Sequence, residues 1–165
     1  MRKRTTTVII LAILPLSIGA AQQAPYAGME NRAIKALSPE QVDGYLSGEG
    51  MSLALAAELN GFPGPKHVLD LGAELELDDE QRQSVERLYG AMNERAVSLG
   101  RDIVEAETRL DAAFADRTMT TENLREQLDA LGRLYGDLRF THLAAHLQTV
   151  AVLSDHQVMQ YQRLR

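Results

Sequence analysis

The feature of this 165-residue chain that most constrains its fold is a run of apolar and small residues spaced three and four apart. Its members are Val85, Leu88, Met92, Ala96, Leu99, Ile103, Ala106, Leu110 and Ala113. Four heptads with this spacing predict one long amphipathic helix with a narrow apolar seam. With Asp78 as its N-cap and two acidic residues in its first turn, we expect the helix to run from Asp78 to about Asp116. Such a helix is not stable alone in water, so its seam must meet another helix.

A second seam follows directly after the polar residues 117–120. It consists of Leu124, Leu128, Leu131, Tyr135, Leu138, His142, Ala145 and Val152, in a helix capped by Thr120 or Thr121. Two long helices joined by so few residues must fold back antiparallel. The sequence therefore predicts an all-α fold: a long antiparallel helical hairpin with short N-terminal helices and a short C-terminal helix.

The segment before the hairpin reads as short helical pieces. Residues 29–59 form helices interrupted near Pro39 and at residues 48–50, and residues 60–65 combine two glycines with two prolines. No regular element passes through such a cluster. A further short helix is expected at residues 66–75.

The first residues resemble a secretory leader. Arg2, Lys3 and Arg4 precede an apolar run that ends in small residues at Ala21, and the run is too short to cross a bilayer comfortably. We therefore expect a signal peptide at residues 1–21, a single helical domain at residues 22–165 and a periplasmic location, without a membrane span in the mature chain. The alternative is that the leader stays uncleaved as an anchor.

The charge of the chain bears on its partners. Removal of the leader takes away three of the 17 basic residues, which changes the net charge from −6 to about −9. A protein this acidic is not expected to bind nucleic acid. Cationic partners, metal ions or basic segments of unfolded proteins suit it better.

One five-residue pattern occurs three times. A leucine is followed by Ser or Asp at an N-cap position and by Gln three residues after that cap, at residues 37–41, 77–81 and 153–157. Each copy fits a capping box, in which the cap side chain accepts from the N3 amide and the Gln side chain reaches back.

This repeated pattern resembles the LTxxQ signature of the Spy/CpxP family of periplasmic helical chaperones and stress sensors, whose relatives include heavy-metal sensors and zinc-resistance proteins. The copy at Leu77 departs from it, because Asp78 stands in place of Ser or Thr. The likeness extends from about Met29 to the C-terminus. It implies a thin, curved antiparallel homodimer whose concave face binds proteins, with metal binding in some branches.

Histidines are the sharpest candidates for a site. His142 and His146 are four apart, so they share one helix face at the spacing that two imidazoles need to hold one metal ion. His67 is expected to approach the same end of the hairpin. The relatives' ligand types imply a set of His142 and His146 with His67 or Glu58, and with Met51 as a soft ligand, for a divalent ion such as zinc, nickel or copper. The alternative is that His142 fills a seam position with one ring nitrogen hydrogen-bonded, and that His146 is a half-exposed polar residue.

No catalytic constellation stands out in the sequence. Cysteine is absent, no carboxylate pair lies in an apolar setting, and no serine lies in a nucleophile elbow. We therefore expect a binding protein and not an enzyme. The first hypothesis is a periplasmic chaperone-like or envelope-stress-sensing protein that binds partly unfolded proteins or a membrane sensor protein. The second is a dedicated heavy-metal sensor or resistance protein.

Overall fold

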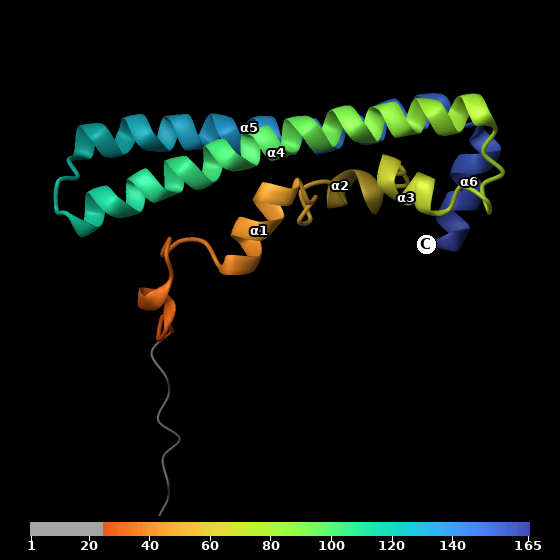
Figure 1. Ribbon diagram of the computed structural model, residues 1–165. Coiled ribbons are helices and arrows are strands. Elements are labelled where there is room, and N and C mark those ends of the chain that lie inside the picture. Colours follow the sequence, from red (N-terminus) through yellow and green to blue (C-terminus); the bar gives the residue numbers. More distant parts are fainter. Residues whose placement is uncertain (1–24) are drawn as a thin grey trace, which may run out of the picture.

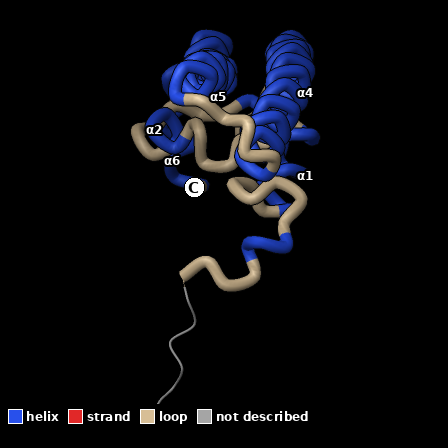
Figure 2. The backbone as a smooth tube through the Cα atoms, turned by 90° about the vertical axis from the view of Figure 1, so that its left-hand side faces the viewer, coloured by secondary structure: helices blue, strands red, loops and turns tan. Residues whose placement is uncertain are grey.

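The computed structural model describes residues 25–165, which are all-α and contain no strand. Within them, two long antiparallel helices lie side by side and shorter helices pack beneath one half of this hairpin (Figures 1 and 2). The elements are η1 (Met29–Asn31), α1 (Pro39–Ser47), α2 (Leu55–Glu58), α3 (Pro65–Asp70), α4 (Asp79–Ala115), α5 (Thr121–Val152) and α6 (Asp155–Leu164). The predicted all-α hairpin is confirmed. The expected leader at residues 1–21 lies outside the described residues.

The hairpin consists of α4 and α5. At 1.5 Å per residue, the 37 residues of α4 make a rod about 55 Å long. Arg117 adopts a left-handed backbone conformation (φ 57°) in the turn, and the Thr120 hydroxyl caps α5 by accepting from the Asn123 amide at 3.2 Å. We call the end with this turn the tip, and the opposite end, where α4 begins and α5 finishes, the base. Within residues 25–165, no helix is both long and apolar enough to cross a membrane.

Two apolar clusters hold the fold together. The first lies along the middle of the hairpin and contains Ala96, Leu99, Ile103 and Leu138, with Tyr45, Leu53, Leu134 and Tyr135 against it. The second lies at the base and contains Val68, Leu75, Val85, Leu153 and Tyr161. Both are built from hairpin residues and from the arm, by which we mean residues 29–77, or from α6. The predicted seams are thus buried, although mainly in the half that the arm covers.

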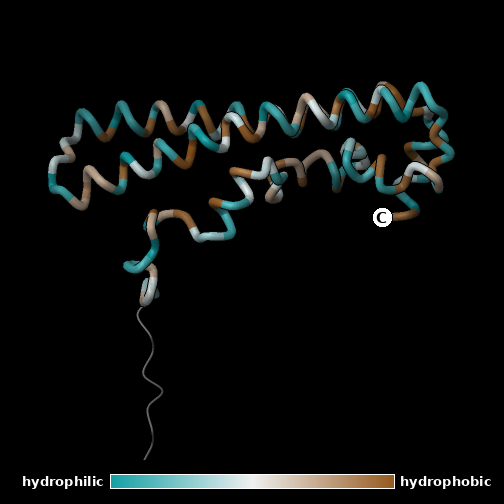
Figure 3. Tube along the Cα trace, in the orientation of Figure 1, coloured by the Kyte–Doolittle hydropathy of each residue, from teal (hydrophilic) through white to brown (hydrophobic). Residues whose placement is uncertain are grey.

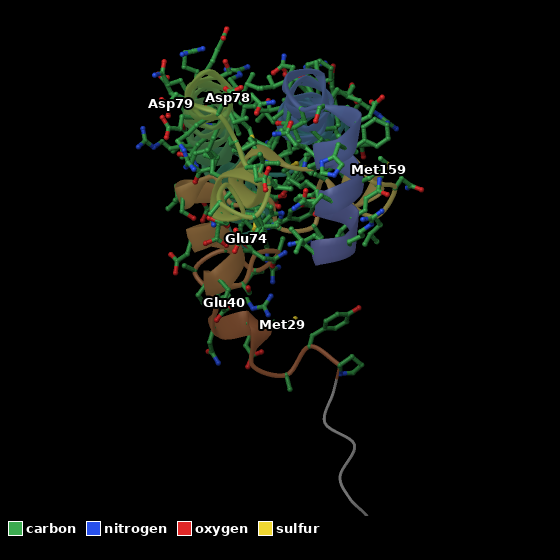
Figure 4. The ribbon with its side chains drawn as sticks, turned by 90° about the vertical axis from the view of Figure 1, so that its right-hand side faces the viewer. Met29, Glu40, Glu74, Asp78, Asp79 and Met159 are labelled. Carbon is green, nitrogen blue, oxygen red and sulfur yellow. The ribbon has the colours of Figure 1, made fainter. Side chains whose placement is uncertain are left out.

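All three expected capping boxes are present, and two of them meet. Asp78 caps α4 at the base (Figure 4), and the Gln81 amide oxygen accepts from the Asp78 backbone amide at 3.3 Å. Ser154 and Gln157 repeat this arrangement at the start of α6. The side-chain amides of Gln81 and Gln157 donate to each other at 2.9 Å, and Gln157 also donates to the Leu75 carbonyl at 3.1 Å. Each glutamine therefore caps its own helix and also ties two helix starts together.

The helix expected at residues 66–75 is shorter than predicted. It ends at Asp70, and the chain then forms turns up to residue 76, where Glu76 adopts a left-handed conformation (φ 50°). Glycine at position 72 weakens a helix there. The turns place Leu75, only 1% exposed, in the cluster at the base. The turns keep backbone hydrogen bonds of their own, including one from the Leu75 amide to the Leu71 carbonyl at 2.9 Å.

The arm and the hairpin approach each other most closely where α1 ends. A Cβ atom added to Gly100 of α4 would lie 2.0 Å from the Tyr45 carbonyl oxygen, which is a backbone atom that cannot swing away. Gly90, on the same helix, faces open space. Only the first of these two glycines is therefore required by packing.

We predict that Gly100→Ala and Gly90→Ala change stability in opposite directions. Alanine favours helix over glycine by about 1 kcal/mol, so Gly90→Ala should stabilise the protein by up to that amount. At position 100 the methyl group must push α1 away, and we expect a net loss of about 1–3 kcal/mol. Urea unfolding of both variants measures the difference. Equal effects of the two substitutions would contradict the close approach.

Candidate functional site

A cavity of about 550 Å³ lies between the arm and the half of the hairpin nearer the base. Its walls are residues 47–52, α2, the start of α3, and the facing sides of α4 and α5. Tyr89 and Met92 contribute apolar surface. Its remaining charged or titratable lining includes Glu49, Glu58, Lys66, His67, His142, His146 and Arg165. All three histidines expected at a site thus line one cavity.

Glu58 is the most buried carboxylate at this cavity. Its side chain is only 8% exposed, although it lies at the end of a four-residue helix. The Tyr161 hydroxyl donates to its Oε1 atom, and the Arg165 guanidinium forms an ion pair with the same oxygen at 2.9 Å. Burial and this carboxylate raise the pKa of Tyr161. A buried charge must be paired and hydrogen-bonded, and α6 supplies both partners.

His146 and His67 lie on either side of Glu58. The Nδ1 atom of His146 is 3.7 Å from Glu58 Oε2, and the Nδ1 atom of His67 is 3.6 Å from Oε1. His146 Nδ1 lies 2.7 Å from the Phe62 carbonyl oxygen, which can only accept, so this nitrogen carries the proton. His146 is 8% exposed. The expectation of a half-exposed His146 is therefore wrong, because the arm folds over it.

His142 occupies the seam, as the alternative without a metal predicted. It is 3% exposed, and its Nε2 atom is buried with no hydrogen-bond partner among the described residues. The hydrogen bond that this alternative also expected is thus absent at Nε2. Burial lowers the pKa of His142, and the charge of His146 adds a smaller effect in the same direction. The ring is therefore neutral at neutral pH.

These positions test whether the expected ligands fit a metal ion. Glu58 Oε1 already accepts from the Tyr161 hydroxyl and is paired with the Arg165 guanidinium, and the proton on His146 Nδ1 blocks that nitrogen. The sulfur of Met51 lies over Gly44, where an added Cβ would be 2.4 Å from it. Among residues 25–165, no group of three or more His, Asp or Glu side chains is arranged to hold a metal ion. As the side chains stand, the donors lie near one another without converging.

The sequence prediction of this site was incomplete. It brought together His67, His142 and His146 with Glu58, but it missed Tyr161 and Arg165. These two residues belong to no motif. Their spacing of four puts them on one side at the end of α6, but only the docking of that helix on the arm brings this side to Glu58. Comparison of the chain with protein-family models, with curated proteins and with solved structures found no match.

The lowered pKa of His142 predicts a pH-dependent stability. Below about pH 6.5, its ordinary value, the ring takes up a proton in the unfolded chain but resists it in the folded one. The unfolded state then binds more protons, so the free energy of unfolding falls as the pH falls. We expect His142→Gln to reduce the loss of stability between about pH 7.5 and 5.5. His156→Gln, which changes an exposed histidine, is the control. Urea unfolding at both pH values is the measurement, and identical slopes for both variants would contradict the prediction.

Proposed function

We propose that this protein acts in the cell envelope by binding other proteins non-covalently, as a chaperone-like or stress-sensing protein. The observation that carries the proposal is that the hairpin extends beyond the arm that covers it (Figure 1). The expected leader and the likeness of the three Leu-x-x-x-Gln patterns to the Spy/CpxP signature support the compartment and the class. Partly unfolded proteins are the partners that this surface suits best.

The end of the hairpin near the tip exposes two large apolar side chains. The arm contacts α4 as far toward the tip as Asp111, whose carboxylate accepts from the Lys35 amide at 3.2 Å. Beyond this point Phe114 is 56% exposed. On α5, Leu128 is 46% exposed although it belongs to the predicted seam. Apolar residues continue along both helices toward the turn (Figure 3). We call Leu110, Phe114, Leu124 and Leu128 the tip patch.

Charges of both signs surround the tip patch. Exposed side chains near it include Glu105, Arg109, Asp116, Arg117, Glu122, Arg125 and Glu126. Such a surface holds an apolar segment weakly while its charged border keeps the protein soluble. Weak binding lets a client detach and fold without nucleotide hydrolysis. This combination is what an ATP-independent chaperone requires.

We predict that the tip patch is needed to prevent client aggregation. Phe114→Ser combined with Leu128→Ser removes the two exposed apolar side chains and should weaken the suppression of aggregation by about tenfold in the concentration required. The measurement is light scattering by a client that is heated or reduced in the presence of stoichiometric amounts of this protein. Leu46→Ser combined with Met159→Ser is the matched control, because these residues are 42% and 51% exposed away from the tip. Met159 lies on α6 at the base (Figure 4).

Two outcomes would count against this proposal. One is that the wild-type protein gives no suppression even at large molar excess. The other is that the tip-patch variant protects the client as well as the control variant does.

A second apolar surface, the outer face of α5, suits a second copy of the chain. Gly132, Gly136, Phe140, Leu143 and Leu147 recur every three or four residues on the side of α5 away from its buried seam. Phe140 is 71% exposed and Leu147 is 60% exposed, and both glycines face open space. An antiparallel two-fold pair would place the large side chains of each copy over the small positions of the other. A homodimer through this face is therefore part of the proposal.

We predict that Gly136→Leu disrupts self-association. A leucine at this position fills the space into which the partner's large side chain would pack, and the dimer dissociation constant should rise by at least about tenfold. Gly90→Leu makes the same change at an open position on α4 and should leave the dimer intact. Sedimentation equilibrium measures the mass of each variant. A monomeric wild-type protein, or equal masses for the two variants, would refute this interface.

A further inference from the structure

Glu58 makes contacts that join parts of the chain far apart in sequence. It lies in the arm, whereas Tyr161 and Arg165 lie more than a hundred residues later on α6 and at the residue after it. The Arg165 side chain is 42% exposed, so its guanidinium reaches in from the surface while the Glu58 side chain stays buried. Arg165 also lies over the Tyr161 ring, 5.9 Å from its centroid. The guanidinium is thus held by a carboxylate and an aromatic face at once.

The surroundings of Glu58 already supply a cation at one of its two oxygens. Oε1 has the Tyr161 hydroxyl as donor and the Arg165 guanidinium as ion-pair partner. On the other side lies the backbone of Gly64, where a Cβ would be 2.9 Å from His146 Nε2 and 3.6 Å from Glu58 Oε2. Oε2 is buried without a hydrogen bond among the described residues. The nearby His146 Nδ1 atom, 3.7 Å from Oε2, keeps its proton because it hydrogen-bonds the Phe62 carbonyl. A metal ion could bind Oε1 only by displacing Arg165 and Tyr161 from it.

We propose that Arg165 is the built-in cation of this site and that Glu58, Tyr161 and Arg165 form a latch that fastens the end of α6 to the arm without a metal ion. α6 is then fixed at both ends: Gln157 holds its start to Gln81 and Leu75, and the latch holds its end to Glu58. The Tyr161 ring also belongs to the apolar cluster at the base. A metal ion held by Glu58 Oε1 would instead take the place of Arg165.

Three variants of the full chain test the latch. Arg165→Ala removes the cation, Arg165→Lys keeps the charge, and Tyr161→Phe keeps the ring but removes the hydroxyl donor. Arg163→Ala is the matched control, because it removes an exposed arginine from the same turn of α6. The readouts are amide hydrogen exchange in α6 and α2, and the thermal midpoint with EDTA and with zinc, nickel or copper.

We expect Arg165→Ala to speed exchange at residues 161–164 and in α2 by about tenfold or more, because it leaves a buried carboxylate without its cation. Arg165→Lys should restore part of the protection, Tyr161→Phe should give an intermediate effect, and Arg163→Ala should match the wild type. The wild-type midpoint should be the same with EDTA and with each metal. Circular dichroism checks that each variant is helical.

Two results would overturn the latch. If Arg165→Ala exchanges like Arg163→Ala, the ion pair does not hold α6. If a metal ion raises the wild-type midpoint, EDTA lowers it and His146→Ala abolishes the difference, a cation and not Arg165 balances Glu58. Neither result bears on the tip patch, so the proposed function is tested separately.

Discussion

A long amphipathic helix in water has to cover its apolar side, and most of this structure follows from how far that requirement is met. α4 packs beside α5 (Figure 1), but two helices in contact still leave a groove of seam residues on each side of their line of contact. The arm fills this groove from the base to about Asp111. Leu99 and Ile103, in the covered half, are at most 1% exposed, whereas Phe114 and Leu128 lie open near the tip. The shortness of the arm, relative to the hairpin, creates the surface to which we assign binding.

The hairpin was predictable because its information is local. Apolar spacing identifies each long helix, and a cap of Asp or Thr with a short polar turn identifies where each begins, so the predicted start at Asp78 and the observed N-cap agree. The end of α3 was not predictable in this way. Leu75 leaves the helix because a distant cluster buries it, and no pattern near residue 70 contains that cluster.

The site shows the same division more sharply. Histidines four apart on α5 had to share a face, and the seam position of His142 implied burial. The surroundings of Glu58 consist of residues 62, 146, 161 and 165, which meet only after the arm and α6 have docked. The sequence indicated which residue types could form a site, but the pairing of Glu58 with Arg165 is a property of the tertiary structure. Glu107 is a parallel case: it is 9% exposed, accepts from the Tyr135 hydroxyl at 2.9 Å and has no sequence signature.

The contact between Gly100 and the Tyr45 carbonyl has a consequence for how such a chain can change over time. A missing side chain at one position on α4 receives the last turn of α1, so α1 cannot slide along the hairpin by a residue or rotate about its own axis. The register of the arm is therefore set by the lack of a Cβ atom at Gly100. Insertions or deletions before residue 45 are tolerated only if they leave this contact in place. The length of the arm can therefore vary only in the residues that precede α1. Such variation would also change how much of the hairpin the arm covers.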